Sequence, residues 1–469
     1  MLRTGAIGPL RWLGVTLGAL GASGVSGLGG APVARANPAS LVASAIDPGD
    51  PIDLHLELDY DYSVETARIR REVLGAPVDP LDPLPDVNDL DFKQFRHRLV
   101  PRAELGILPN TSLSVALPIV IAQQRELSLA PGVTRDSSTT IADGLLPMGG
   151  FDARDPGTPL TGDAVFRGVS RSGVDQLHAG MTLALMNQDN DPSKPTWKLG
   201  GELRIPVGRV MRFDADDPSS ATGVGRGIYE VRVATSVARR FGRAEGWFEL
   251  YWQAPITAKR GALLDLPAAE QFGATNTAAS QRGGVGAGVE VYAVEDKAGG
   301  NQISLDLGSR VDAHFEGREY SELWEVFAYA GRVGAGGAGS GPLVLDADPT
   351  TMELEARAHP GVSNVENYLE LAGRAAVRAR LGRYVRFAAT LDFVWRTDHV
   401  ISFADAGVDL PTCGAGVSGP CENETNSVVS RGTREVNPIH VDTIDLVGHR
   451  YISVNGFGFV VGVQGQILF

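Results

Sequence analysis

Hydrophobic and polar residues alternate in many separate stretches of the chain, and the last stretch shows the pattern most clearly. From Phe457 to Phe469, apolar and aromatic residues occupy the odd positions, with glycine at 465, and the even positions are mostly small or polar. Alternation with a period of two is typical of a β-strand that has one apolar face. Its length and its apolar face would let it cross a bilayer as a tilted strand of a barrel.

The same alternation recurs along the rest of the chain. In the first such segment, leucines and tyrosines alternate with acidic residues between Asp53 and Glu65. The pattern predicts about twelve strands, at residues 53–65, 96–107, 112–121, 177–185, 197–207, 229–237, 248–252, 285–293, 303–315, 365–377, 385–395 and 457–469.

The connections between these strands alternate between long and short without exception. They span roughly residues 65–95, 108–111, 124–174, 188–195, 208–227, 241–245, 256–283, 296–301, 316–364, 382–384 and 398–449. A soluble sandwich has no reason to place every long loop at one end, whereas an outer-membrane barrel has short periplasmic turns and long extracellular loops. We therefore predict an all-β fold: a transmembrane antiparallel up-and-down β-barrel of about 12 strands, in the outer membrane of a Gram-negative bacterium.

The N-terminal 36 residues have the features of a secretory signal peptide. Arg3 and Arg11 give a positive start, an apolar run follows, and Ala34-Arg35-Ala36 provides a cleavage site. The alternative is a membrane anchor, which the many glycines disfavour. The predicted organisation is a signal peptide at 1–36, a periplasmic linker at 37–51 and a single barrel domain at 52–469. Because the linker is short, we expect any plug inside the barrel to come from a loop.

Charge and cysteine content narrow the possible partners. The formal net charge is −14, and loss of three arginines with the signal peptide would leave about −17, so no nucleic-acid partner is predicted. Cys413 and Cys421 lie close together in a Pro/Gly/Ser-rich segment, which favours a local disulfide in an exported protein. Two sulfurs without a nearby histidine make a poor zinc site, and we predict no metal and no cofactor.

Three short stretches resemble one family of outer-membrane proteins. They are Ser112–Pro118, Leu199–Gly208, and Gly225–Val233 with the Arg240–Gly242 turn that follows. In these the chain is similar to the channels associated with phenol and meta-cleavage degradation, which are related to the fatty-acid transporters. The resemblance covers about a third of the chain. It implies a channel in the outer membrane, although a strongly apolar fatty-acid tunnel is disfavoured because few inward positions are large and apolar.

The polar faces of the predicted strands carry many charges, and these residues are the candidate lumen lining. The candidates are Glu57, Asp59, Asp61, Arg98, Arg102, Lys198, Glu202, Arg204, Glu230, Arg232, Asp306, Arg310, Glu370, Arg374, Arg386 and Asp392. Opposite charges on neighbouring strands can pair across the sheet. The lumen is therefore either water-filled and charge-selective, or packed with ion pairs and nearly closed, and the sequence leaves both possibilities open.

Three functions are consistent with this fold. The first is a channel or passive uptake pore for small molecules. The second is a closed barrel that acts as a surface scaffold or receptor through its long acidic loops. The third, an outer-membrane hydrolase, has weaker support: His399 and Ser402 are three residues apart, and His449 and Ser453 four, so neither pair has the two-residue spacing that places both side chains on one face of a strand.

Other expectations concern the C-terminus and one loop. Ile467 and Phe469 are expected to face lipid and to form the assembly signal recognised by the barrel-assembly machinery. Tyr320–Tyr329 is too aromatic for a freely solvated loop, so we expect it to fold over or into the barrel mouth, with Gly334–Gly341 beside it as a hinge.

Overall fold

The structure is a computed structural model. It describes residues 41–45, 53–74, 84–256, 263, 278–296, 299–334, 341–347, 355–404, 437 and 439–469. The predicted signal peptide, Cys413 and Cys421 lie outside the described residues, so the cleavage site and the disulfide stay predictions.

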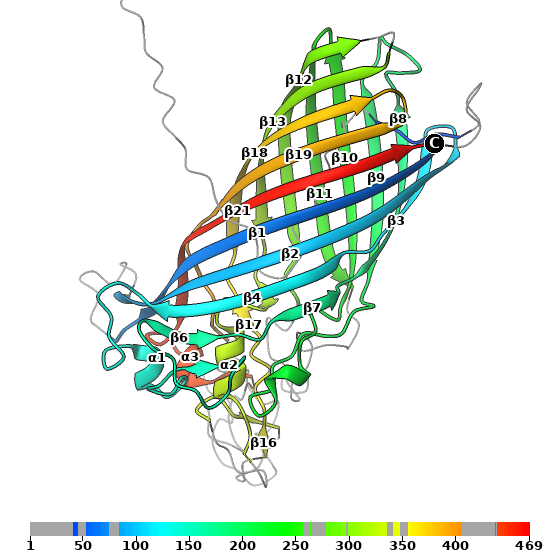
Figure 1. Cartoon of the computed structure of the whole chain (residues 1–469). Coiled ribbons are helices and arrows are strands. Elements are labelled where there is room, and N and C mark those ends of the chain that lie inside the picture. Colours follow the sequence, from blue (N-terminus) through cyan, green and yellow to red (C-terminus); the bar gives the residue numbers. More distant parts are fainter. Residues whose placement is uncertain are drawn as a thin grey trace, which may run out of the picture.

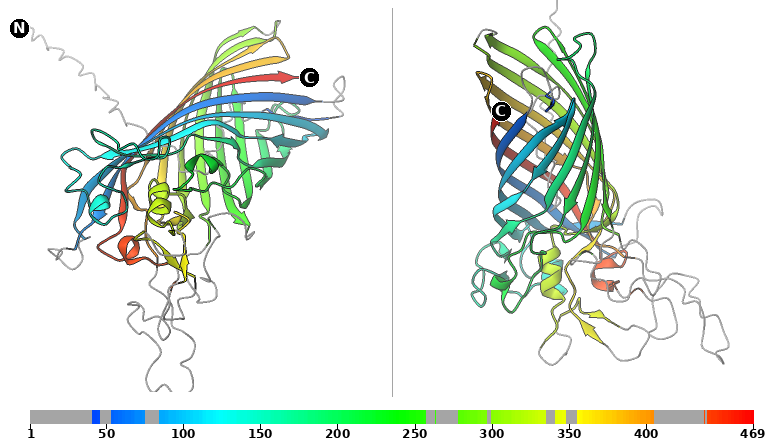
Figure 2. Two further views of the ribbon diagram at one scale, coloured as in Figure 1. Left: turned by 60° about the horizontal axis from the view of Figure 1, so that its bottom comes forward. Right: turned by 90° about the vertical axis from the view of Figure 1, so that its right-hand side faces the viewer.

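The described strands close into a 12-strand antiparallel barrel, which confirms the predicted fold (Figures 1 and 2). Eleven positions are single strands: β1 (Leu54–Glu72), β2 (Asp86–Leu108), β8 (Leu177–Met186), β9 (Thr196–Ile205), β10 (Tyr229–Phe241), β11 (Ala244–Ile256), β12 (Arg282–Asp296), β13 (Asn301–His314), β18 (Tyr368–Leu381), β19 (Val385–Arg396) and β21 (Tyr451–Leu468). The third position is split into β3 (Thr111–Ala116) and β4 (Ile119–Leu129).

The last strand pairs with the first and closes the ring. In β1, Leu58 lies opposite Pro101 of β2 and opposite Gly465 of β21. At the end of the β1–β21 pairing, the backbone N–H groups of Leu54 and Phe469 donate to each other's carbonyls, at 3.1 and 2.9 Å. Closure pairs the backbone groups of the wall, which the interior of a bilayer requires. Both strand ends lie at the rim with the short turns, which we assign as periplasmic.

The alternation in the sequence separates the two faces of the wall. Apolar side chains such as Leu58, Val233 and Phe387 are exposed on the outside, where lipid would cover them. Ile467 and Phe469 also face outward, which is the side we expected for the assembly signal. Charged side chains face inward and are mostly buried.

One part of the wall is interrupted. Pro118 has no backbone N–H to donate and separates β3 from β4. On the neighbouring strand, Asp175 and Gln176 separate β7 (Arg171–Val174) from β8. The sequence predicted one continuous strand at 112–121. The two interrupted positions of the wall are still joined at the break, because the Asp175 N–H donates to the Pro118 carbonyl at 3.1 Å.

The extracellular connections fold together into a compact unit, here called the cap, below the barrel in Figure 1. Its elements are α1 (Thr139–Ala142), β5 (Phe151–Asp152), β6 (Ala164–Arg167), η1 (Pro218–Ser220), β14 (Gly317–Glu319), α2 (Trp324–Ala330), β15 (Leu345–Asp346), β16 (Ala356–Arg357), β17 (Ser363–Val365), β20 (His399–Val400) and α3 (Asp442–Asp445). None of the helices in the described part of the chain is long and apolar enough to cross a membrane.

The cap has a hydrophobic core of its own. Phe327 of α2 is fully buried and packs with Phe166 of β6 and with Tyr451 of β21. Residues from the outer ends of β1, β2 and β4 complete this core, among them Ile69. The aromatic segment 320–329 therefore folds over the mouth, as its composition indicated, whereas most of the suggested hinge lies outside the described residues.

Two expectations about the chain near the first strand are wrong. Residues 65–95 are not one loop, because β1 and β2 stay paired out to Glu72 and Asp86. Beyond the lipid, their outer face changes from apolar to charged, as at Arg68 and Lys93. Because the outer face is no longer apolar there, the sequence pattern did not show that β1 and β2 continue. In addition, a loop is not the sole segment that enters the barrel, because Leu41–Ala43, within the predicted linker, line the cavity at the periplasmic mouth.

Candidate functional site: the barrel lumen

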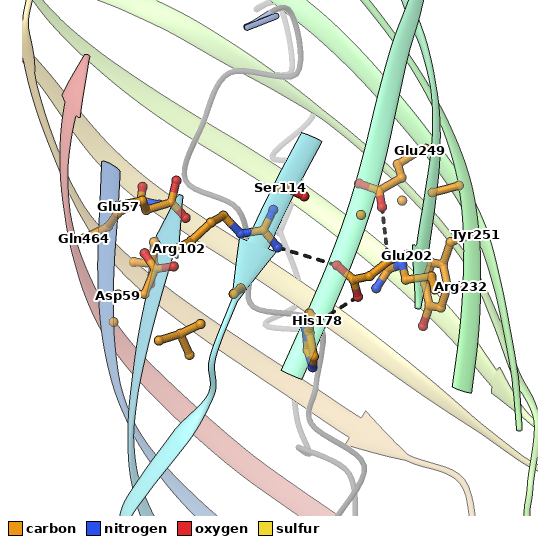
Figure 3. Close-up of a pocket in the computed structure, with 18 of the residues that line it drawn as sticks. Glu57, Asp59, Arg102, Ser114, His178, Glu202, Arg232, Glu249, Tyr251 and Gln464 are labelled. Atoms are coloured by element: carbon orange, nitrogen blue, oxygen red, sulfur yellow. Dashed lines mark hydrogen bonds and ion pairs between the residues drawn. The ribbon is translucent and has the colours of Figure 1, made fainter. Parts of the chain in front are cut away.

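The barrel encloses a cavity of about 270 Å³ (Figure 3). A cavity needs roughly 10–15 Å³ to hold one water molecule, so this volume has room for several. Its lining extends from Leu41–Ala43 at the periplasmic mouth to Arg96 and Glu370 near the cap. The lumen is therefore a chamber with room for water and not a fully packed core.

Charges of both signs line this chamber in nearly equal number. The acidic residues are Glu57, Asp59, Asp61, Glu104, Asp175, Glu202, Glu249, Asp306, Glu370 and Asp392. The basic residues are Arg96, Arg98, Arg102, Lys198, Arg204, Arg232, Arg310, Arg374 and Arg378. Counting one charge for each, ten acids against nine bases leave the lining close to neutral.

Most of the candidate lumen residues lie in this lining, and two do not. Glu230 is buried beside the cavity, where it accepts hydrogen bonds from Arg226 at 2.7 Å and Gln253 at 3.0 Å. Arg386 lies in register with Gln466, nearer the periplasmic rim than the lining of the cavity. Asp175, in the break of the wall, lines the cavity but was not predicted, since no alternation marks that position.

Ion pairs join side chains along the inner face of the wall. Arg98 donates to Asp61 at 2.9 Å, joining β2 to β1. Arg102, also on β2, reaches over β3 and β8 to Glu202 of β9, with 3.6 Å between nitrogen and oxygen (Figure 3). Glu202 also accepts from Arg204 at 2.9 Å. These pairs hold charged side chains in place around the cavity.

An aromatic wall faces the chamber from β11. Trp247 and Tyr251 lie over β12 and β13, where a Cβ added at Gly288 or Gly308 would come within 2.6 or 2.7 Å of the Trp247 ring. The glycines therefore leave room for that ring. Tyr251 donates to Asp312 at 2.7 Å, and the Arg232 guanidinium lies 4.0 Å from its ring centroid. Both aromatics occupy inward positions of β11 and line the cavity, but they were not among the predicted lumen residues.

The cap closes the extracellular end of the chamber through three glutamates of one segment. Glu325 pairs with Arg171 at 2.6 Å. Glu322 pairs with Arg396 at 3.0 Å, and Glu319 pairs with Arg226 of the 206–228 connection at 3.0 Å. A second, small cavity of about 20 Å³ lies between this segment and the wall.

The periplasmic end is narrowed by residues 41–45. The Ser44 N–H donates to Asp53 at 3.1 Å, and the Ser44 hydroxyl accepts from the Asn110 N–H at 2.9 Å. Lys198 donates to the Leu41 carbonyl at 3.1 Å. The backbone of Ser44 passes so close to Gly106 that a Cβ there would meet it at 2.5 Å. This segment is therefore held against the inner wall.

The serines considered for hydrolysis are bonded elsewhere. The Ser402 hydroxyl donates to the Ile444 carbonyl at 2.8 Å, and the Ser453 hydroxyl donates to Glu322 at 3.1 Å. His399 stacks on Tyr368, with 4.1 Å between ring centroids. Within the described residues no group of three or more His, Cys, Asp or Glu side chains is arranged to hold a metal ion.

Comparisons with known proteins give likenesses of structure alone. No family model and no curated protein matches the sequence. An outer-membrane channel from Pseudomonas putida F1 is 12% identical, with 90% of this chain and 100% of that chain covered and a TM-score of 0.38. A FadL homologue from Pseudomonas aeruginosa is 8% identical, with 91% and 96% covered and a TM-score of 0.30.

The outer-membrane protease OmpT of Escherichia coli is 7% identical, with 88% of this chain and 97% of that chain covered and a TM-score of 0.25. The channel and the protease are outer-membrane proteins, but overlaps this low carry no argument about activity. The assignment of this chain as an outer-membrane β-barrel follows from its own closed wall and apolar outer face.

Proposed function

We propose that this protein is an outer-membrane channel that passes small polar molecules through the barrel lumen. The observation that carries the proposal is the charged cavity of about 270 Å³ inside the barrel. An 8-stranded barrel is filled by its own side chains, while 16-stranded porins leave an open aqueous channel. A 12-strand wall lies between these sizes, so it leaves space for small solutes and brings charges close to them.

In the described structure, this channel is closed on the extracellular side, so passage requires the cap to move. The lumen side of the capping segment is held by charged pairs, at Glu319, Glu322 and Glu325. Once separated, such groups can be hydrated, whereas separated apolar groups cannot regain their contacts. We infer that opening separates these pairs first.

The second candidate function is a closed barrel that serves as a surface scaffold or receptor. The hydrophobic core of the cap supports it, because Phe166, Phe327 and Tyr451 join the connections into one stable unit. A permanently closed cap would display the extracellular surface and conduct nothing. Catalysis is not part of either proposal, since the Ser402 and Ser453 hydroxyls are bonded elsewhere.

Single-channel recording in planar bilayers tests the two functions. We expect the wild type to open rarely, and the triple variant Glu319→Gln, Glu322→Gln, Glu325→Gln to open more often with the same unit conductance. Glu355→Gln, an exposed acid of the same connection, is the matched control and should behave as wild type. Absence of conductance in both the wild type and the folded triple variant would reject the channel in favour of the closed barrel.

A further inference from the structure

Two short turns at the rim that we assign as periplasmic share one sequence pattern. Residues 240–243, after β10, read Arg-Phe-Gly-Arg, and residues 380–383, after β18, read Arg-Leu-Gly-Arg. In both turns the glycine has a positive φ, of 61° and 62°. The first arginine donates from Nε to the glycine carbonyl, at 3.0 and 3.1 Å. The first arginine therefore holds the turn, and the second, Arg243 or Arg383, is exposed at its tip.

The turn after β10 has a further arginine on the outer face of the wall. Arg239 has the same outward phase as Val233 and Phe241, which are 52% and 66% exposed. Its guanidinium carbon lies 4.9 Å from the centroid of the Phe241 ring. The equivalent position before the second turn is Ala379. The two turns therefore differ by one guanidinium on the side of the lipid.

Arg239 has no partner for its charge within the described part of the chain. Its Nε is buried and donates no hydrogen bond, and its guanidinium forms neither an ion pair nor another hydrogen bond with any described residue. Arg243 likewise has no side-chain partner there. Buried donors are normally satisfied, and an arginine on a lipid-facing wall is costly unless its charged group reaches the membrane interface.

The position of Arg239 along β10 places it at that interface. It is two residues from Phe241, the last residue of the strand, which corresponds to about 7 Å along the strand. The phosphate groups of the periplasmic leaflet lie at this level, and phosphate oxygens accept paired N–H groups from a guanidinium. A soluble partner would approach the tip of the turn, whereas Arg239 points outward into the lipid layer. A lipid headgroup is therefore the partner that this orientation favours.

The wall beside Arg239 leaves space for the rest of a lipid. Arg239 lies opposite Gly246 of β11, and a Cβ added at Gly246 would meet nothing within 4 Å. On the other side of Gly246, Val289 of β12 is apolar and 39% exposed. An acyl chain can therefore lie against Gly246 and Val289 while its headgroup contacts Arg239.

We propose that Arg239 and Arg243 form a binding site for the phosphate of an anionic phospholipid in the periplasmic leaflet. Arg239 donates from the lipid side, and Arg243 adds a second positive charge from the turn. A zwitterionic headgroup carries its own ammonium group, so two unpaired arginines favour a headgroup with a net negative charge. This site is independent of the channel function, because it lies on the outer face of the barrel.

Tryptophan quenching in vesicles tests the site. The full-length folded protein is reconstituted in phosphatidylcholine that contains increasing fractions of dibrominated phosphatidylglycerol, because bromine quenches nearby indoles. Trp197 of β9 is the reporter: it is 36% exposed on the outer face and lies opposite Val237, two residues from Arg239. Its signal is the difference between the protein and its Trp197→Phe variant. We expect quenching at lower fractions of this lipid than of dibrominated phosphatidylcholine.

The variants distinguish a site from general attraction by charge. Each arginine near an anionic headgroup is expected to contribute about fivefold in affinity, so Arg239→Gln and Arg243→Gln should each weaken the phosphatidylglycerol effect by about this factor. Arg383→Gln is the matched control, because it removes the same charge from the same type of turn, where Ala379 replaces the second arginine. It should change the apparent affinity by less than about twofold.

A displacement measurement on the wild type needs no variant. Unbrominated phosphatidylglycerol should restore the Trp197 signal, and the same amount of unbrominated phosphatidylcholine should not. Equal quenching by the two brominated lipids, failure of this displacement, or an equal loss in Arg383→Gln and Arg239→Gln would overturn the site. The heat-modifiable band confirms that each variant is folded before its quenching is compared.

Discussion

The contact between Arg171 and Glu325 is expected to hold the cap on the barrel mouth. Both side chains are almost fully buried, at 1% and 3% exposure. The Arg171 Nε and Nη2 groups donate to one oxygen of Glu325 at 3.0 and 2.6 Å. Arg171 also donates to the backbone carbonyls of Ala221, Gly223 and Arg212. One guanidinium therefore joins the wall, the 206–228 connection and α2.

Arg171→Met should loosen the cap strongly. Leaving Glu325 buried without its partner costs about 3–5 kcal/mol, and each carbonyl that loses its donor adds about 1 kcal/mol. Loss of the Arg171–Glu325 pair alone corresponds to about a 10²- to 10⁴-fold rise in the population of molecules with an open cap. Limited proteolysis of the folded protein measures this population, since cleavage follows the open state when opening and closing are fast.

A double-mutant cycle separates charge from packing. Arg171→Met with Glu325→Leu removes both charges, and replacing a buried pair by apolar groups is often near neutral, so most of the protease resistance should return. Arg167→Met is the control for an exposed pair: Arg167 and Asp152 are 3.4 Å apart and the arginine is 43% exposed, so the effect should be within about 1 kcal/mol. If the double variant is cleaved as fast as Arg171→Met, the ion pair does not hold the cap.

Three further predictions concern topology, assembly and pH. Cysteine placed at Asp155, which is exposed in the cap, should react with an impermeant thiol reagent on intact cells and cysteine at Asn110 should not; the reverse labelling would invert the topology. Deleting Phe469, which faces outward at 57% exposure, should reduce the heat-modifiable folded band without altering the unit conductance, and normal assembly would contradict the closing-strand role. Burial raises the pKa of Asp445 in the cap to about 6, although the nearby charge of His440 acts to lower it. Because the carboxyl of an unfolded aspartate titrates near 3.9, the stability of the cap should fall as pH rises from about 4 to 6 and then level off. Protease resistance measures this change, and Asp445→Asn should abolish it.

The sequence was sufficient for the wall of the barrel because the wall repeats one simple rule. A strand in lipid must show apolar groups outward, so residues such as Leu58 and Val233 mark its phase. This rule does not apply to the parts of the strands that extend beyond the lipid bilayer. At Arg68 and Lys93 the outer face becomes charged, so the continuation of β1 and β2 into the cap had no apolar signal, although Ile69 and Phe92 on the inner face pack in the cap core.

The interior of the molecule depends on contacts that alternation does not encode. The pattern placed Arg102 on the inward face, but its partner Glu202 lies on β9, which β3 and β8 separate from β2. Likewise, Arg171 and Glu325 are 154 positions apart, and their contact follows from the folding of two connections. Such distant pairs depend on barrel closure and register, which residue spacing alone does not give.

Arg98 and Arg102 show why the chamber is neither an open pore nor a packed core. Both face the acidic residues of β1, yet Arg98 pairs with Asp61 directly, whereas Arg102 reaches over β3 and β8 to Glu202. Many of the lining charges are paired with other side chains, yet a cavity of about 270 Å³ stays between them. Arg102 carries its positive charge along the inner face of the wall, toward β9. The electrostatic consequence is local: although the lining is almost neutral in sum, a solute meets individual charges at fixed places in the cavity, and selectivity depends on where those charges lie and not on their sum.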